Sequence, residues 1–355
     1  MPSAQTTMLS SLPLEIFDLV INNLHRQGPT IKACCLVSKS WALRIRKHLF
    51  AHIDFLSHES IGSWMEAFPD PLNSPAHHVH SIRIYAEALT AITSSNARPW
   101  LRSFRSVASL RLAGHRTDGG FLEAVDLICS FPLLKNISFY FSASGGNIGS
   151  GWVLPSTSPK LDGHLVLGGG GAGAVIRQLL PLPGGLHFAG IQALCSAGDA
   201  KSVADLVLSC SHTLESLKIR YTSTFPSAPV AGQYLIVTTV TATSRKPPPL
   251  DLSMALKLKD VEFWSDIQDV QWITKSLRSI QFRNLRQVKI AINLPARLLN
   301  PVGKLLHHKL MELDRLLVNL WTSHSVDLWV ECRAANGRSL LPEITSKEGV
   351  RILED

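Results

Sequence analysis

The chain has 355 residues, of which 45% are hydrophobic and 17% are charged, and its formal net charge is +8. This composition predicts one large or two ordinary globular domains and excludes an intrinsically disordered chain. No stretch reaches 18 uninterrupted apolar residues, so we expect no membrane-spanning helix.

Residues 1–11 are short and polar, and we predict that they form a disordered N-terminus. They lack the basic region and apolar core of a signal peptide. The six cysteines show no C-x-x-C spacing, which favours free thiols in a reducing compartment and therefore a cytoplasmic or nuclear protein.

The first periodic segment predicts a helix that begins near Pro13, because Leu14, Phe17, Ile21 and Leu24 recur at helical spacing. Other apolar residues of this segment fall outside that stripe, so the helix is apolar on nearly all sides and needs a partner as well as its own core. A second helix is expected over 30–37. A third is expected after Ser38, with an apolar repeat every four residues at Trp41, Ile45 and Leu49.

Two short motifs accompany these helices. Leu-Pro-x-Glu-Ile at 12–16 lies at the start of the first helix, and Leu-Val-Ser-Lys-x-Trp at 36–41 joins the second helix to the third. Together they resemble the F-box, a three-helix module that binds the Skp-family adaptor of cullin–RING ubiquitin ligases. The resemblance covers residues 12–53, and we assign 12–55 to this domain. The linker at 25–28 lacks the Pro-x-x-Asp-Leu of many members. The resemblance implies that these residues bind the adaptor: Leu12, Pro13, Leu14, Ile16, Val20, Leu36, Val37, Ser38 and Trp41. An ordinary three-helix cap that buries its own core is the alternative.

Residues 56–355 repeat the spacing L-x-x-L-x-L, with other aliphatic residues or Phe allowed. The repeats lie at 79/82/84, 107/110/112, 134/137/139, 214/217/219 and 285/288/290. Further strands are expected at 164–167 and 188–194, and helix-like segments at 120–130, 174–180, 200–210 and 302–320. This pattern is similar to leucine-rich repeats and implies an irregular α/β solenoid. The predicted fold class is therefore α/β: a three-helix F-box followed by a leucine-rich-repeat-like solenoid. A doubly wound α/β domain is the alternative.

The repeats are degenerate. The Asn or Cys expected three residues after each last apolar position occurs only at Asn293, so we expect irregular turns and uneven repeat lengths. Two irregular insertions, 142–160 and 222–250, interrupt the period, and the second could add an edge strand within 233–243.

In such strands, the residue between the last two apolar positions faces the ligand side, and four of these five residues are basic. A strand expected at 256–259 adds Lys257 and Lys259. The candidate substrate-binding residues are Arg83, Tyr85, Arg111, Tyr140, Lys218, Arg220, Lys257 and Lys289. Such a basic stripe would suit an acidic or phosphorylated peptide. A nucleic-acid surface and an ordinary soluble face are the alternatives.

Other motifs do not build a catalytic site. Residues 168–173 satisfy G-x-G-x-x-G but lack the following carboxylate of a dinucleotide site, so a glycine-rich turn is expected. His77, His78 and His80 lack metal-ligand spacing. We expect no cofactor, no bound metal and no enzymatic activity.

The sequence thus predicts a substrate-recognition subunit of an SCF-type E3 ubiquitin ligase. Its expected partners are a Skp-family adaptor, a cullin bound through that adaptor, and an unknown target protein that is acidic or phosphorylated. We expect no association with a membrane. The alternatives are an F-box scaffold outside ubiquitination and a basic solenoid that binds nucleic acid, of which the nucleic-acid interpretation is the less favoured.

Overall fold

The computed structural model describes residues 14–24, 28–36, 39–93, 96–116, 121–143, 158–169, 171–221, 247–266, 269–293, 304–333, 341–347 and 351–352. The predicted disordered segment 1–11 and the possible strand at 233–243 lie outside the described residues. The chain divides into two compact units, Met1–Leu110 and Arg111–Asp355. None of the helices in the described ranges is long and apolar enough to cross a lipid bilayer.

The first unit begins with three short helices and continues with parallel strands and further helices. Its elements are α1 (Leu14–Leu24), α2 (Gly28–Cys35), α3 (Lys39–Leu49), β1 (His52–Phe55), α4 (His58–Ala67), η2 (Pro71–Asn73), η3 (Pro75–His78), β2 (Ser81–Tyr85), α5 (Ala86–Thr93) and α6 (Arg98–Ser103). Strand β3 (Ser109–Arg116) begins at the end of this unit. Helices therefore occur where the first 50 residues predicted them.

An aromatic core holds the strands and α4 of the first unit together. Trp64 of α4 contacts Phe50, Phe55, Phe68 and Phe104, with ring centroids 4.7–6.2 Å apart. The pairs with Phe50 and Phe55 meet edge to face, the arrangement that aromatic quadrupoles favour, whereas the pairs with Phe68 and Phe104 are tilted. This cluster packs α4 against β1, the first strand of the sheet.

The second unit alternates strands and helices. Its elements are β4 (Asn136–Ala143), β5 (His164–Gly168), β6 (Gly190–Cys195), β7 (Ser216–Tyr221), β8 (Asp260–Asp266), β9 (Gln287–Asn293), β10 (Asp327–Arg333) and β11 (Arg351–Ile352), with α7 (Phe121–Ser130), α8 (Ala172–Leu179), η4 (Ala197–Asp199), α9 (Ala200–Ser209), α10 (Val270–Arg278), η6 (Phe282–Asn284), α11 (Lys304–His324) and α12 (Pro342–Thr345).

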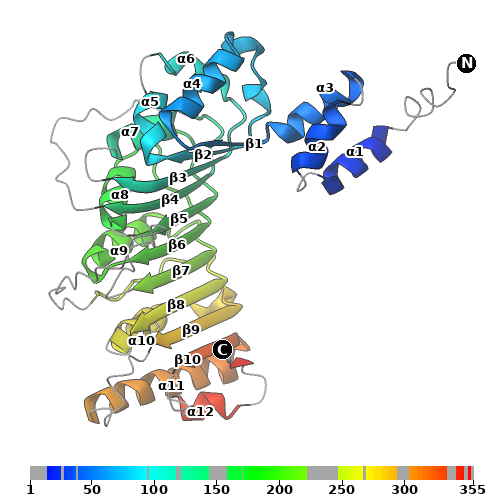
Figure 1. Cartoon of the computed structure of the whole chain (residues 1–355). Coiled ribbons are helices and arrows are strands. Elements are labelled where there is room, and N and C mark those ends of the chain that lie inside the picture. Colours follow the sequence, from blue (N-terminus) through cyan, green and yellow to red (C-terminus); the bar gives the residue numbers. More distant parts are fainter. Residues whose placement is uncertain are drawn as a thin grey trace, which may run out of the picture. The chain divides into compact units, whose positions relative to one another are not determined.

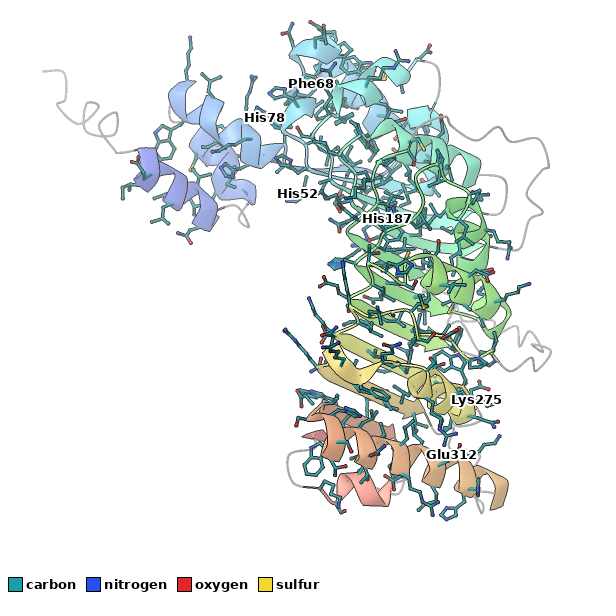
Figure 2. All side chains as sticks on the ribbon, turned by 180° about the vertical axis from the view of Figure 1, so that it is seen from behind. His52, Phe68, His78, His187, Lys275 and Glu312 are labelled. Atoms are coloured by element: carbon teal, nitrogen blue, oxygen red, sulfur yellow. The ribbon has the colours of Figure 1, made fainter. Side chains whose placement is uncertain are left out.

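Strands β4 to β11 pair in chain order, and every pair is parallel. Helices α8, α9 and α10 lie along one side of these strands (Figure 1). Consecutive helices such as α8 and α9 pack on each other. The second unit is thus a mixed α/β structure with a parallel sheet, as the sequence predicted, and its sequential strand order differs from the reordered strands of a doubly wound domain.

The apolar positions of the L-x-x-L-x-L spacing form the core between strands and helices. All fifteen are buried, from Val79, Ile82 and Ile84 to Leu285, Val288 and Ile290. Because strand residues alternate between faces, the intervening positions remain on the other face of the sheet.

A ladder of backbone carbonyls occupies the edge of the sheet where the strands begin. One carbonyl per repeat accepts two N–H groups from the next repeat: Glu215 O accepts from Lys259 N at 2.8 Å and from Asp260 N at 3.2 Å. The carbonyls of Gly163, Ala189 and Lys259 do the same, and so does that of His80 within the first unit. These hydrogen bonds satisfy backbone groups at the start of each strand and join each repeat to the next.

One strand differs from the sequence prediction. The strand expected at 256–259 lies at 260–266, and residues 251–259 form turns instead. The repeats after β7 and after β9 are longer than the others, in agreement with the predicted uneven repeat lengths, and α11 lies close to the helix expected over 302–320.

Candidate functional site

The three N-terminal helices enclose a small apolar core. Ile21 of α1, Ile31 of α2 and Ile45 of α3 are fully buried against one another. Trp41 and Leu49 pack against this core and are partly buried, as their four-residue spacing predicted. Three isoleucines are a minimal core for a segment of this size.

Several large apolar side chains on these helices point to solvent instead. Leu36 is 89% exposed, Leu43 66%, Leu19 60%, Ile16 45% and Val20 40%. Single exposed apolar residues are common, but five such side chains on or next to three short helices indicate a segment that a partner covers. We call these five residues the apolar surface of α1–α3.

The predicted adaptor residues divide into three groups. Ile16, Val20 and Leu36 belong to the apolar surface of α1–α3, whereas Trp41 mainly closes the core. Leu14 begins α1, and its side chain is not described. Leu12, Pro13, Val37 and Ser38 lie outside the described residues.

The sequence prediction missed Leu43. It lies on α3 two positions from both Trp41 and Ile45, and therefore on the side of the helix away from the core. The available signal was an apolar residue among the basic side chains Arg46 and Lys47, both of which are exposed.

On the sheet face of the second unit, the register brings the predicted substrate residues into rows. One row runs through Lys218, Glu262 and Lys289 to Trp329. Lys218 Nζ lies 3.2 Å from Glu262 Oε2, and Lys289 Nζ lies 5.0 Å from the centroid of the Trp329 ring. Each predicted lysine of this row therefore has a partner.

Two of the other predicted cations lie against aromatic rings. The Arg111 guanidinium lies 4.3 Å from the Tyr140 ring centroid, and that of Arg220 lies 4.9 Å from the Trp264 ring centroid. Such cation–π contacts stabilise by roughly 0.5–1 kcal/mol at exposed sites. Of the predicted residues, Arg111 and Tyr140 thus stack on each other, whereas Arg220 stacks on Trp264.

In the first unit, Arg83 lies at the register position beside Asp54 of β1, with Arg83 Nη1 3.4 Å from Asp54 Oδ2. Tyr85 ends β2 and is half-buried. Asp54 and Glu262 pair with Arg83 and Lys218, so acidic residues interrupt the expected basic stripe. Lys257 lies in the turns before β8 and not in a row.

Within the glycine-rich segment 168–173, where a turn was expected, Gly169 and Gly171 lie between the end of β5 and the start of α8. Gly171 caps α8 with a φ of 96°, which other residues rarely adopt. The N–H of Gly173 donates to Asp199 Oδ1 at 3.0 Å, and a side chain at Gly173 would collide with that carboxylate. Packing of the turn on the next repeat accounts for these glycines.

The described residues contain no group of three or more histidine, cysteine or acidic side chains placed to hold a metal. Cys34, Cys35, Cys129, Cys195 and Cys210 are free thiols, as predicted. Burial raises the pKa of Cys129 and of Cys210 to about 11, so both thiols are protonated and poor nucleophiles at neutral pH.

No protein family model matches the chain, and no curated protein matches it. Among solved structures, a complex of Rad7 and Elc1 from yeast is similar, with a TM-score of 0.33 and 12% sequence identity over 96% of this chain and 92% of that chain. This TM-score is too low to support a conclusion about fold or function.

Proposed function

We propose that this chain is the substrate-recognition subunit of an SCF-type E3 ubiquitin ligase. In this proposal, residues 12–55 are an F-box that binds a Skp-family adaptor, and residues 56–355 are a leucine-rich-repeat-like solenoid that binds a target protein. The subunit contributes no chemistry. It acts by proximity, because a bound target has a high effective concentration near the ubiquitin-charged conjugating enzyme.

The observation that carries the proposal is the apolar surface of α1–α3. Burying a leucine side chain fully contributes roughly 1.5–3 kcal/mol, so covering Leu36, Leu19 and Leu43 together would supply much of the free energy of a stable complex. The surrounding exposed cations, Lys32 and Lys39 among them, would speed association with an acidic adaptor.

A pull-down with a purified Skp-family adaptor tests this proposal. Leu36→Asp places a charge on the apolar surface and should abolish recovery of the adaptor. Leu72→Asp is the matched control, because Leu72 is a leucine of the same unit that is 82% exposed on η2. Equal recovery with the wild-type chain and both variants would contradict the proposal.

A second measurement separates a ligase subunit from an F-box scaffold. The adaptor complex purified from cells should contain a cullin if the chain serves a ligase. A complex that holds the adaptor without a cullin would indicate a scaffold.

A further inference from the structure

A basic pocket lies at the edge of the sheet where β7, β8 and β9 begin. Its volume is about 460 Å³. Six polar side chains line it above the buried Leu285: Glu215, Lys257, Lys259, Arg283, Asn284 and Arg286. The pocket is separate from the rows of the sheet face and belongs entirely to the second unit.

The carbonyl ladder fixes the geometry of this pocket. Glu215, Lys259 and Arg286 occupy the same position in three consecutive repeats, one residue before each strand. Lys259 N donates to Glu215 O at 2.8 Å, and Arg286 N donates to Lys259 O at 2.7 Å. Hydrogen bonds between the backbones of neighbouring repeats therefore hold the side chains of Glu215, Lys259 and Arg286 next to one another.

Neighbouring turns hold the remaining side chains. Leu258 and Leu285 are buried and anchor the two turns in the core. Asn284 Nδ2 donates to Leu256 O at 2.6 Å and joins one turn to the other. Lys257 and Arg283 extend from these anchored turns.

The charge of the pocket is unbalanced. Its single carboxylate, Glu215, is bound by Lys259, with Lys259 Nζ 2.6 Å from Glu215 Oε2. The hydrogen bond and charge of Lys259, with smaller contributions from Lys257 and Arg286, lower the pKa of Glu215. Within the described residues, no carboxylate forms an ion pair with Lys257, Arg283 or Arg286. Three cations thus remain available to a ligand.

We propose that this pocket binds the phosphate groups of an anionic ligand. A phosphate monoester carries nearly two negative charges at neutral pH and three acceptor oxygens, whereas a carboxylate carries one charge. Arg283 and Arg286 offer planar forks that pair with phosphate in two hydrogen bonds, and Lys257 adds a compact charge. Phosphate binding at this pocket does not require adaptor binding by α1–α3. The two proposals can therefore be tested separately.

The phosphate could belong to a small polyphosphate or to a phosphorylated side chain of a protein. Isothermal titration calorimetry on the full chain in low salt distinguishes them with three ligands: tripolyphosphate, a peptide with one phosphoserine among neutral residues, and the same peptide without phosphate. Binding of tripolyphosphate alone assigns the site to small polyphosphates. Binding of the phosphopeptide but not of its unphosphorylated form assigns it to modified protein.

The double variant Arg283→Ala/Arg286→Ala should weaken the observed binding about tenfold or more. Lys201→Ala/Arg315→Ala is the charge-matched control, because both residues are exposed on helices of the same unit away from the pocket, and it should change the affinity less than about twofold. Circular dichroism verifies that both variants fold. Lys257→Glu gives a second variant at an exposed turn and should weaken binding at least as much. Failure of both phosphorylated ligands to bind, or an equal loss in the pocket and control variants, would overturn the proposal.

Discussion

Lys218 on β7 and Glu262 on β8 occupy matched register positions, and their charged groups lie 3.2 Å apart. The Glu262 carboxylate also accepts a hydrogen bond from the Trp264 indole at 2.7 Å. Glu262 therefore places a negative charge between Lys218 on β7 and Lys289 on β9, in a row whose other charged residues are these two lysines. This pair explains why the sheet face is not a uniform positive stripe.

A double-mutant cycle measures the Lys218–Glu262 pair. Because Lys218 is about half exposed, solvent screens the attraction, and we expect a coupling free energy of about 0.3–1 kcal/mol in urea unfolding. Glu262→Gln is a useful control, since it keeps an acceptor for the Trp264 indole. Strictly additive effects of the two single substitutions would show that the pair does not form in solution.

Ser276 of α10 tests how the end of the long insertion is held. Its hydroxyl accepts a hydrogen bond from the N–H of Leu250 at 2.9 Å, and both residues are buried. Ser276→Ala leaves that N–H without a partner and should lower the free energy of unfolding by about 1–3 kcal/mol. Ser209→Ala, at an exposed site near the end of α9, should change it by less than about 0.5 kcal/mol. Similar stability of the two variants would contradict this contact.

Ile45 tests the core of the N-terminal helices. Ile45→Ala removes one of three fully buried isoleucines and should cost about 2–4 kcal/mol. Hydrogen exchange should accelerate across α1–α3 while β5 to β9 remain protected. Leu43→Ala lies on the exposed side of the same helix and should leave exchange unchanged. Faster exchange in the Leu43 variant than in the Ile45 variant would reverse the assignment of buried and exposed faces.

The cysteines give a pH-dependent prediction. Burial raises the pKa of Cys210 to about 11, so its thiol stays protonated at pH 8 and thiolate forms only as the pH rises towards 11. Iodoacetamide at pH 8 should modify the partly exposed Cys34 but leave Cys210 intact in the native chain. Mass spectrometry after brief labelling checks this result, and denatured protein provides the positive control. Labelling of native Cys210 at the rate of the denatured chain would refute its burial.

The sequence predicted the inner face of the sheet well, because buried strand positions must be apolar at a fixed spacing. It missed the position of β8, although Leu258, Val261 and Phe263 obey the same spacing and are all buried. The apolar residues Met254 and Leu256 lie in exposed turns before β8. The predicted strand began too early because it included Leu256. An apolar residue in the sequence does not by itself show whether its side chain is buried in a strand or exposed in a turn.

The ladder at the start of the strands could not be predicted from side chains. The residues that supply its carbonyls include Ala189, Glu215 and Lys259, which share no chemistry. Any residue can offer its backbone carbonyl, so no side-chain pattern in the sequence indicates this ladder.

The candidate sites also differ in how far the sequence could predict them. The resemblance to the F-box implied Ile16, Val20 and Leu36 as adaptor residues, and the structure leaves all three exposed. The neutralised row was missed because Glu262 lies on the misplaced strand. The basic pocket was missed because its side chains come from turns whose proximity depends on the stacking of three repeats.

The most direct test of the proposed function is hydrogen exchange of the full chain with and without a purified Skp-family adaptor. The adaptor should slow exchange in α1–α3, over residues 14–49, and leave β5 to β9 unchanged. Protection confined to the parallel sheet, or no protection at saturating adaptor, would contradict the assignment of the N-terminal helices as the adaptor-binding module.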